Sequence, residues 1–463
     1  MRLKVFNILV IVFIVVFGKS VYAETNYVLD VDGSKRIPVP LTYEVKNIIQ
    51  PVSNNSTLMR DAQDLFIDRQ NFIYVADTGN NRILKLSHEG NFLKVFSGSE
   101  DSPLKKPEGI FVDNDGDLYI ADTGNSRILH LDPEGGFVEE FFKPETEMLE
   151  NTGFSPGKVC MNSIGSLYVL RHNSLMIIDG YGDFRGYVGA TRVKFNLIEY
   201  IGRTFATKEQ KEQLLDLIPS AYTSFTVAND GMIYAATTEY GQMRKLNDTG
   251  KNSFKEKFYG EAADDEGNPI EPYFSDIVLD QYGIITVLER NTRKIYQYDQ
   301  EGNLLTVFGG RGNWKGAFAS VNSLAVDSEG RIFVLDGVEN DIQVFEPTRF
   351  MKLVHSALLL YYEGKYQEAL NIWNEVRMIH SGYPMSNKGI AKALLKQGQY
   401  SEAMERYKMA GDKEGYSQAF GFHLHQLYRK YFVYIVLSVA ISALILIYAV
   451  RYGRLTSRQF LNL

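Results

Sequence analysis

The chain has 463 residues and a formal net charge of −7, with 49 Lys and Arg against 56 Asp and Glu. This acidic balance argues against a nucleic-acid-binding protein, because phosphate recognition relies on clustered cations and no basic aromatic patch replaces them here. The single cysteine, Cys160, excludes an internal disulfide, and its position in an apolar run favours a buried side chain over a reactive thiol.

Residues 1–23 have the pattern of a secretory signal. Arg2 and Lys4 precede an apolar core, and small residues lead to a plausible cleavage site after Ala23. An uncleaved anchor is the alternative, although the apolar core is shorter than the ~20 residues that a membrane span needs. Cleavage would remove three cations and take the net charge from −7 to −10.

The segment after the signal repeats itself. The sequence YVADTGNNRILKLSHEG (Tyr74 to Gly90) returns as YIADTGNSRILHLDPEG (Tyr119 to Gly135), so Asp77 and Asp122 lie 45 residues apart. A period near 45, with alternating apolar runs broken by Asp, Asn and Gly, is typical of a four-stranded β-propeller blade. One blade cannot bury its own apolar faces, so the period predicts several packed blades.

Looser copies of the repeat begin at Val159, Phe225, Ile277 and Leu324, which gives six blades. The last copy runs through three strands and then meets a helical pattern, so it lacks a fourth strand. Two strand-like runs within 27–50 precede the first complete blade, and we predict that one of them completes the sixth blade.

The best repeat resembles a known family. The segment from Lys106 to Phe141 is similar to the NHL repeat in its Pro-x-Gly start, its Asp-x-x-Gly hairpin, its Ala-Asp-Thr-Gly-Asn turn and its Arg-Ile pair. Two blades match closely and four loosely, over roughly Leu65 to Phe345. The predicted fold is therefore mainly β, a six-bladed NHL-type β-propeller over residues 24–349.

A helical insert interrupts the period between the third and fourth blades. Residues 189–223 contain FNLIEYIGRTF, an amphipathic pattern, and KEQKEQLLDLI, which Thr207 caps and Pro219 ends. Long loops between blades lie on the face where propellers usually bind, so this insert is a candidate for ligand or partner contact. Packing over the central channel explains it equally well.

The periodicity changes to about 3.6 after Arg349, which predicts helices over residues 350–430. Gly364 and Gly398 lie 34 residues apart, and this spacing resembles the tetratricopeptide repeat. The signature positions are Gly364, Ala369 and Trp373 in the first copy and Gly398, Ala403 and Tyr407 in the second. Core packing explains these residues fully, so a binding groove between the helices is a weaker inference.

Residues 431–450 form an uncharged apolar run of the right length for one transmembrane helix. Arg429 and Lys430 precede it, and Arg451, Arg454 and Arg458 follow it, so the flanking charges do not decide the orientation. A signal peptide would place the propeller and the helical repeats outside the plasma membrane and residues 451–463 in the cytoplasm. A buried helix of a soluble protein is the alternative.

Six-bladed propellers include metal-dependent enzymes, so we compared the blades for converging ligands. The residue five positions before the Asp or Asn that ends each first strand forms one ring: Gln63, Glu108, Gly157, Thr223, Ser275 and Asn322. This ring holds one carboxylate, which is too few for a lactonase-type calcium or magnesium site. Glu108 and the neighbouring Asp276 are the weak metal-ligand candidates, and the sequence predicts no catalytic residue and no cofactor.

A second ring, at the turn after each second strand, is richer in acids: Asp77, Asp122, Arg171, Thr237, Glu289 and Asp336. Asp before Thr-Gly-Asn usually accepts hydrogen bonds from its own turn, so we interpret these acids, with Arg82 and Arg127, as structural. His88, His130 and His172 occupy different positions in their blades, which disfavours a zinc-dependent lyase.

The whole layout resembles bacterial membrane-anchored NHL-repeat proteins that accompany sugar ABC importers. This resemblance implies a membrane-tethered, extracytoplasmic binding or scaffold protein, with a protein or carbohydrate partner held by the propeller face and the helical groove. The alternative is a metal-dependent lactonase or lyase that acts on a sugar derivative. A sensor that signals through the helices is a third hypothesis.

Overall fold

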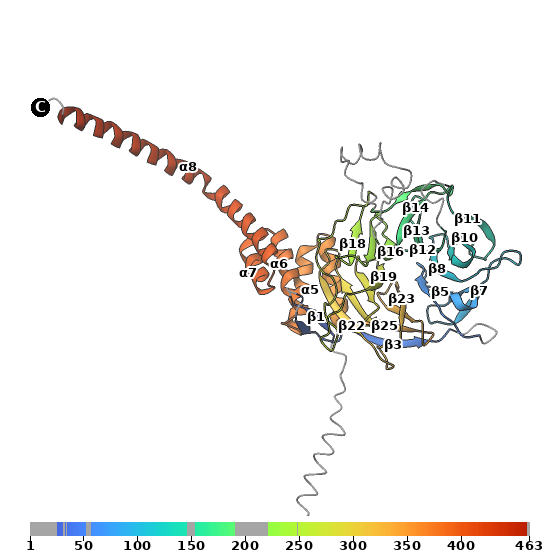
Figure 1. Ribbon diagram of the computed structural model, residues 1–463. Coiled ribbons are helices and arrows are strands. Elements are labelled where there is room, and N and C mark those ends of the chain that lie inside the picture. The colour runs from blue at the N-terminus through green and yellow to red at the C-terminus, as the bar shows by residue number, and fades with distance from the viewer. Residues whose placement is uncertain are drawn as a thin grey trace, which may run out of the picture. The chain divides into compact units, whose positions relative to one another are not determined.

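The computed structural model describes residues 26–30, 33, 35–51, 57–145, 153–189, 221–247 and 249–460, with side chains up to residue 451. The predicted fold class is confirmed: six β-sheets form a propeller, and five helices follow it (Figure 1). The predicted signal peptide and most of the helical insert, residues 190–220, lie outside the described residues.

The first three blades have four strands each, in sequence order from the centre outward. Blade 1 contains β4 (Asp64–Ile67), β5 (Ile73–Asp77), β6 (Arg82–Leu86) and β7 (Phe92–Phe96), with the short helix η1 (Thr78–Asn80). Blade 2 contains β8 (Pro107–Val112), β9 (Leu118–Asp122), β10 (Arg127–Leu131) and β11 (Phe137–Phe141), with η2 (Thr123–Asn125). Blade 3 contains β12 (Pro156–Met161), β13 (Leu167–Arg171), β14 (Ser174–Ile178) and β15 (Phe184–Tyr187).

The other three blades vary in their outer strands. Blade 4 contains β16 (Tyr222–Val227), β17 (Ile233–Thr237) and β18 (Met243–Leu246). Blade 5 contains β19 (Phe274–Leu279), β20 (Ile285–Glu289), β21 (Lys294–Tyr298) and β22 (Leu304–Gly309), extended by β1 (Tyr27–Leu29) and β2 (Arg36–Pro38). Blade 6 contains β23 (Val321–Val326), β24 (Ile332–Asp336), β25 (Asp341–Pro347) and β3 (Tyr43–Ile49).

Asx turns close the first hairpin of most blades. In blade 2, the Asp113 carboxylate accepts hydrogen bonds from the backbone N–H groups of Asp115 and Asp117, at 2.9 and 3.0 Å. Gly116 completes this turn at φ +92°, a conformation that L side chains rarely adopt. The Asp-x-x-Gly motif therefore fixes where each innermost strand turns back.

The sixth blade is completed by the N-terminal segment, as the sequence predicts. Strand β3 pairs antiparallel with β25, in a register that sets Ile49 opposite Ile342 and Tyr43 opposite Pro347. This pairing joins the two ends of the propeller chain and covers the outer edge that β25 would otherwise expose. Ile49 is buried in the cluster that holds blades 6 and 1 together.

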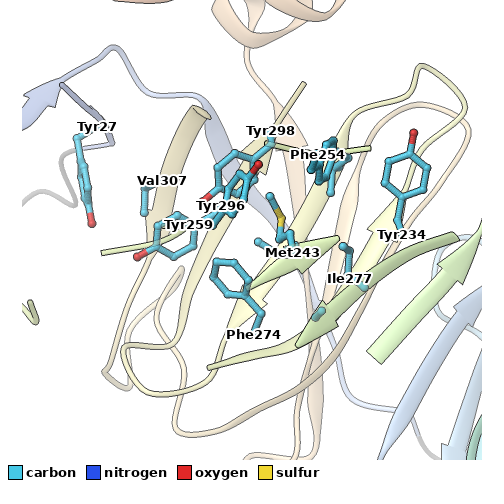
Figure 2. Close-up of a cluster of buried hydrophobic side chains, with 13 residues drawn as sticks. Tyr27, Tyr234, Met243, Phe254, Tyr259, Phe274, Ile277, Tyr296, Tyr298 and Val307 are labelled. Atoms are coloured by element: carbon cyan, nitrogen blue, oxygen red, sulfur yellow. The ribbon is translucent and has the colours of Figure 1, made fainter. Parts of the chain in front are cut away.

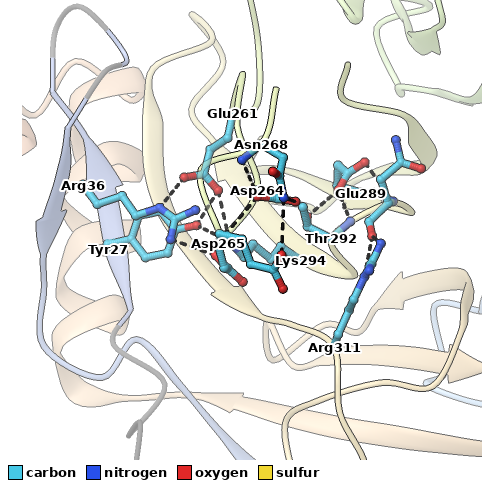
Figure 3. A network of polar contacts seen from close by, with 12 residues as sticks. Tyr27, Arg36, Glu261, Asp264, Asp265, Asn268, Glu289, Thr292, Lys294 and Arg311 are labelled. Atoms are coloured by element: carbon cyan, nitrogen blue, oxygen red, sulfur yellow. Dashed lines mark hydrogen bonds and ion pairs between the residues drawn. The ribbon is translucent and has the colours of Figure 1, made fainter. Parts of the chain in front are cut away.

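A buried carboxylate attaches the other N-terminal strands to blade 5 (Figure 3). Glu261 accepts hydrogen bonds from Tyr27 Oη and Arg36 Nε, both at 2.5 Å, and from Lys294 Nζ at 3.2 Å. Tyr296 Oη adds a fourth at 3.1 Å. Because an unpaired buried carboxylate is costly, these donors make the position of β1 and β2 specific.

The core lies between neighbouring blades. Figure 2 shows one such cluster, in which Tyr234 and Met243 of blade 4 lie among Phe274, Tyr296 and other side chains of blade 5. Alternation along each strand supplies both faces of a blade with apolar side chains, so each sheet packs against two neighbours. Fold stability is therefore shared around the ring.

The C-terminal helices are α4 (Arg349–Tyr362), α5 (Tyr366–Ile379), α6 (Pro384–Lys396), α7 (Tyr400–Met409) and α8 (Lys413–Phe460). The chain divides into two compact units after His355, inside α4. In the second unit α5 packs on α6, α6 on α7 and α7 on α8. The part of α8 from Lys413 to Arg451 is long and apolar enough to cross a membrane by length and composition.

We predict that Ile49→Ala destabilises the propeller by about 2–4 kcal/mol, because it leaves a cavity between the first and last blades. Ile48→Ala on the same strand, where the side chain is half-buried, should cost less than about 1 kcal/mol. Urea unfolding followed by tryptophan fluorescence measures both. Equal losses for the two variants would show that β3 does not contribute to the core.

Candidate functional site

The innermost strands of five blades carry a β-bulge, and the bulge falls at the first ring of aligned residues, which contains Glu108. Strand pairing skips one residue in five blades: Glu108, Gly157, Thr223, Ser275 and Asn322. A bulge adds one residue to a strand and redirects the side chains around it. The residues that meet at the propeller axis are those one position later.

This later ring is mostly polar, and all its members are buried except Lys158, which is partly buried. Its members, one from each blade, are Asp64, Gly109, Lys158, Ser224, Asp276 and Ser323. Lys158 of blade 3 bonds to Asp276 of blade 5, with Nζ 2.6 Å from Oδ1, although these blades are not neighbours. The side chains therefore meet across the axis.

The two carboxylates of the axial ring have several further partners. Asp276 accepts hydrogen bonds from Ser224 Oγ at 2.6 Å and from the Leu324 backbone N–H at 2.9 Å. Ser323 Oγ lies 2.7 Å from Asp276 Oδ2 and 3.0 Å from Asp64 Oδ1. Lys158 Nζ also reaches Asp64 Oδ1, at 3.5 Å.

The glycine in the axial ring is required by close packing. A Cβ on Gly109 would lie 2.5 Å from the Gly157 carbonyl oxygen and 2.9 Å from Lys158 Cα. Only glycine lets strand β8 approach β12 this closely. Blade 2 therefore places no side chain in the axial ring, and the backbone of blade 3 packs against Gly109 instead.

The charges of the axial ring are tightly coupled. Burial opposes the charged form of Lys158, but Asp276 and Asp64 raise the pKa of the lysine well above its usual range. Burial also opposes ionisation of Asp276, but Lys158 and the surrounding donors hold the pKa of this carboxyl below its usual range. The pKa of Asp64 is raised, chiefly by burial and also by Asp276. We infer an ion pair between Lys158 and Asp276, with Asp64 the more readily protonated acid.

The two predicted metal-ligand candidates have different surroundings. Asp276 is bound to Lys158, whereas Glu108 lies at the bulge, with Oε2 3.6 Å from the position that a Cβ would take on Gly157. Burial and the nearby Asp61 raise the pKa of Glu108. Among the described residues, no three His, Cys, Asp or Glu side chains are grouped to hold a metal ion.

The acids of the turn ring bind backbone and arginine. Asp77 accepts from the Arg60 backbone N–H at 2.8 Å and from Arg82 Nε at 2.6 Å. Asp122 repeats the arrangement with Lys105 N–H and Arg127 Nε, both at 2.8 Å. Asp336 accepts from the N–H groups of Ala319 and Ser320. These contacts attach the loop before each first strand to the turn after the second strand.

The helical signature positions lie at turns and in the helical core. Gly364 and Gly398 adopt φ of +80° and +78°, in the turns between α4 and α5 and between α6 and α7. The other four are buried: Ala369, Trp373, Ala403 and Tyr407. A Cβ on Gly389 would lie 2.2 Å from the Trp373 ring, so α6 passes directly over this side chain.

The sequence alone pointed to one member of the axial ring, Asp276, and not to the other five: Asp64, Gly109, Lys158, Ser224 and Ser323. The sequence does contain a pattern that indicates these residues. In the alignment of the blades, the position directly after the first ring holds two acids, a lysine and two serines. Opposite charges in one column of an otherwise apolar strand indicate a buried ion pair.

The chain has similarities to one known family and to several solved structures. Residues 104–131 match the NHL repeat. The solved structures to which this chain is similar include a streptogramin B lyase, at 18% identity over 70% of this chain and 87% of that chain, with a TM-score of 0.41. A virginiamycin B lyase from Staphylococcus aureus has 15% identity over 69% and 86%, with a TM-score of 0.40. The WD40 propeller of Doa1 has 11% identity over 67% and 98%, with a TM-score of 0.41. A comparison with curated proteins found no match.

We predict that Lys158→Met destabilises the propeller by about 3 kcal/mol at neutral pH, because it leaves two buried carboxylates without a cation. The lysine side chain keeps 20% exposure, so the loss should lie at the lower end for buried pairs. Without Lys158 both carboxyl pKa values should lie above their unfolded values.

The sign of the pH dependence follows from these shifts. In the wild type, the contribution of Asp276 is present above its unfolded pKa and is lost as pH falls. In Lys158→Met, ionisation is unfavourable, so the penalty grows as pH rises through the raised pKa values. The difference between the two proteins should therefore shrink towards about pH 4.

Thermal melting across pH tests this, and Lys158→Met with Asp276→Asn should recover part of the loss. A difference that does not depend on pH would contradict the assignment.

Proposed function

We propose that this protein is a membrane-tethered extracytoplasmic binding or scaffold protein. Its propeller face and helical groove would hold a protein or carbohydrate partner, and the partner we favour is a sugar ABC importer. The proposal combines the propeller, the apolar C-terminal helix and the chemistry of the axial ring.

The observation that carries the proposal is the lysine at the axis. In a metal-dependent propeller enzyme, the central carboxylates would need lone pairs directed at a cation. Here the Asp276 carboxylate is occupied by the Lys158 ammonium, Ser224 and backbone N–H groups. This arrangement supports a structural axis and leaves binding to the loops at the propeller face.

The C-terminal helix supports the membrane tether. None of the apolar window of α8 is buried against the rest of the chain, and it includes exposed residues such as Leu444, Leu446 and Ile447. Tyr431 and Tyr448 lie near the two ends of the apolar run 431–450, as aromatic side chains do at membrane interfaces. A helix that is apolar on all faces and unburied is typical of a lipid environment.

We predict that the full chain fractionates with membranes and that a chain ending at Lys430 does not. Leu444→Arg with Leu446→Arg should weaken insertion, because each arginine near the centre of the span costs about 2.5–3.5 kcal/mol. Gln426→Arg with Tyr428→Arg, outside the span, is the matched control. Alkaline extraction of membranes measures retention, and a soluble full-length chain would contradict the tether.

The binding role is tested by crosslinking in intact cells, with mass spectrometry of the captured proteins. A membrane-impermeant crosslinker should join the propeller to transporter subunits, and the chain ending at Lys430 should lose this product. Capture of no specific partner by the membrane-inserted protein would contradict the scaffold proposal.

A further inference from the structure

Blade 3 departs from a bonding pattern that the other blades share. In four blades, the acid of the turn ring accepts a backbone N–H from the loop that leads into the same blade. The donors and acids are Arg60 and Asp77, Lys105 and Asp122, Tyr273 and Glu289, and Ala319 and Asp336, at 2.7–3.0 Å. In blade 4, Glu239 accepts from the Ala221 N–H at 3.3 Å.

Blade 3 has Arg171 in place of this carboxylate. The strand register is kept, since Arg171 pairs with Pro156 and with Ser174 as its counterparts do. The substitution therefore reverses the charge at one position of the repeat and leaves its backbone unchanged. An arginine stands where four blades provide a carboxylate and blade 4 provides Thr237.

Two nitrogen atoms of the Arg171 guanidinium lack an acceptor. Its Nε and Nη1 atoms are buried and have no hydrogen-bond partner within the described ranges. Arginine keeps its charge at all physiological pH values, so it cannot avoid this cost by deprotonation. Leaving the donor atoms of a charged group buried and unpaired is unfavourable, and an anion that accepts hydrogen bonds from them would offset this cost.

The surroundings leave this position reachable from solvent. Arg171 is partly exposed, and His172 and Asn173, which follow it in the turn, are exposed. The backbone carbonyl of Asn173 accepts a hydrogen bond from the Tyr222 N–H, which fixes the turn against blade 4. Arg171 thus lies partly buried in a turn whose next two residues are exposed to solvent.

We infer that Arg171 anchors an anion site on blade 3, and that its ligand presents a carboxylate. The planar guanidinium matches a carboxylate through two parallel hydrogen bonds. One cation balances one negative charge, and a carboxylate is also the group that the other blades place at this turn. The inference deepens the proposed function, on which it rests, by naming the group that the partner would present.

The test measures melting of the full chain in detergent with sodium glucuronate, and with glucose at the same ionic strength. Glucuronate should stabilise the wild type saturably and glucose should not. Arg171→Gln should weaken the apparent affinity at least about tenfold, and Arg171→Lys should weaken it less, because lysine keeps the charge without the paired donors. Arg185→Gln, on the outer strand of the same blade, is the control and should bind as the wild type does. Equal responses of wild type and Arg171→Gln would overturn the site.

A second arm separates an external carboxylate from one of this chain. Glu147 and Glu150 precede β12 in the sequence, so a double-mutant cycle pairs Arg171→Gln with Glu147→Gln and Glu150→Gln. Additive losses of stability support an external ligand, whereas a coupling that accounts for the whole loss would overturn the inference. Crosslinking in cells separates failure of the anion site from failure of the proposed function. If Arg171→Gln captures the same partners as the wild type, the anion site alone is refuted. If the wild type captures no partner, the proposed function is refuted.

Discussion

The ion pair at the propeller axis is the interaction on which the arrangement of the blades most depends. Lys158 belongs to blade 3 and Asp276 to blade 5, so their 2.6 Å contact links two blades that are not neighbours in the ring. Burying these charges is favourable only if every partner is in place. The partners come from two further blades: Ser224 from blade 4, and Ser323 with the Leu324 N–H from blade 6. A displaced blade would leave a buried charge unpaired, so the axial ring selects one arrangement of the six sheets.

The ring also needs its ends joined, and the N-terminal segment does this twice. Strand β3 completes blade 6, and β1 with β2 extends blade 5, where Glu261 binds Tyr27 and Arg36. Closure and axial bonding support one another, because the innermost strands can meet at the axis only in a closed ring.

Much of the fold could be predicted from the sequence because it follows from a period. The 45-residue spacing of Asp77 and Asp122 gave the blade, and the missing strand after Phe345 indicated that an N-terminal strand must close the ring. The axial residues could not be placed to the residue, because the bulge at Glu108 and its counterparts shifts the side chains by one position. The sequence places Arg171 in the turn ring, but it does not predict that two buried nitrogen atoms of this side chain lack an acceptor. That conclusion depends on the hydrogen bonds of the other blades and on the burial of Nε and Nη1.

We propose that the Lys158 ammonium balances the charge of the carboxylates at the axis. The most direct test is the metal content of the purified full-length protein by mass spectrometry, with its melting temperature recorded before and after chelation. We expect less than one equivalent of any divalent metal and no change in melting temperature. Stoichiometric calcium or zinc, with a large loss of stability in chelator, would contradict the claim and restore a lactonase or lyase as the leading hypothesis.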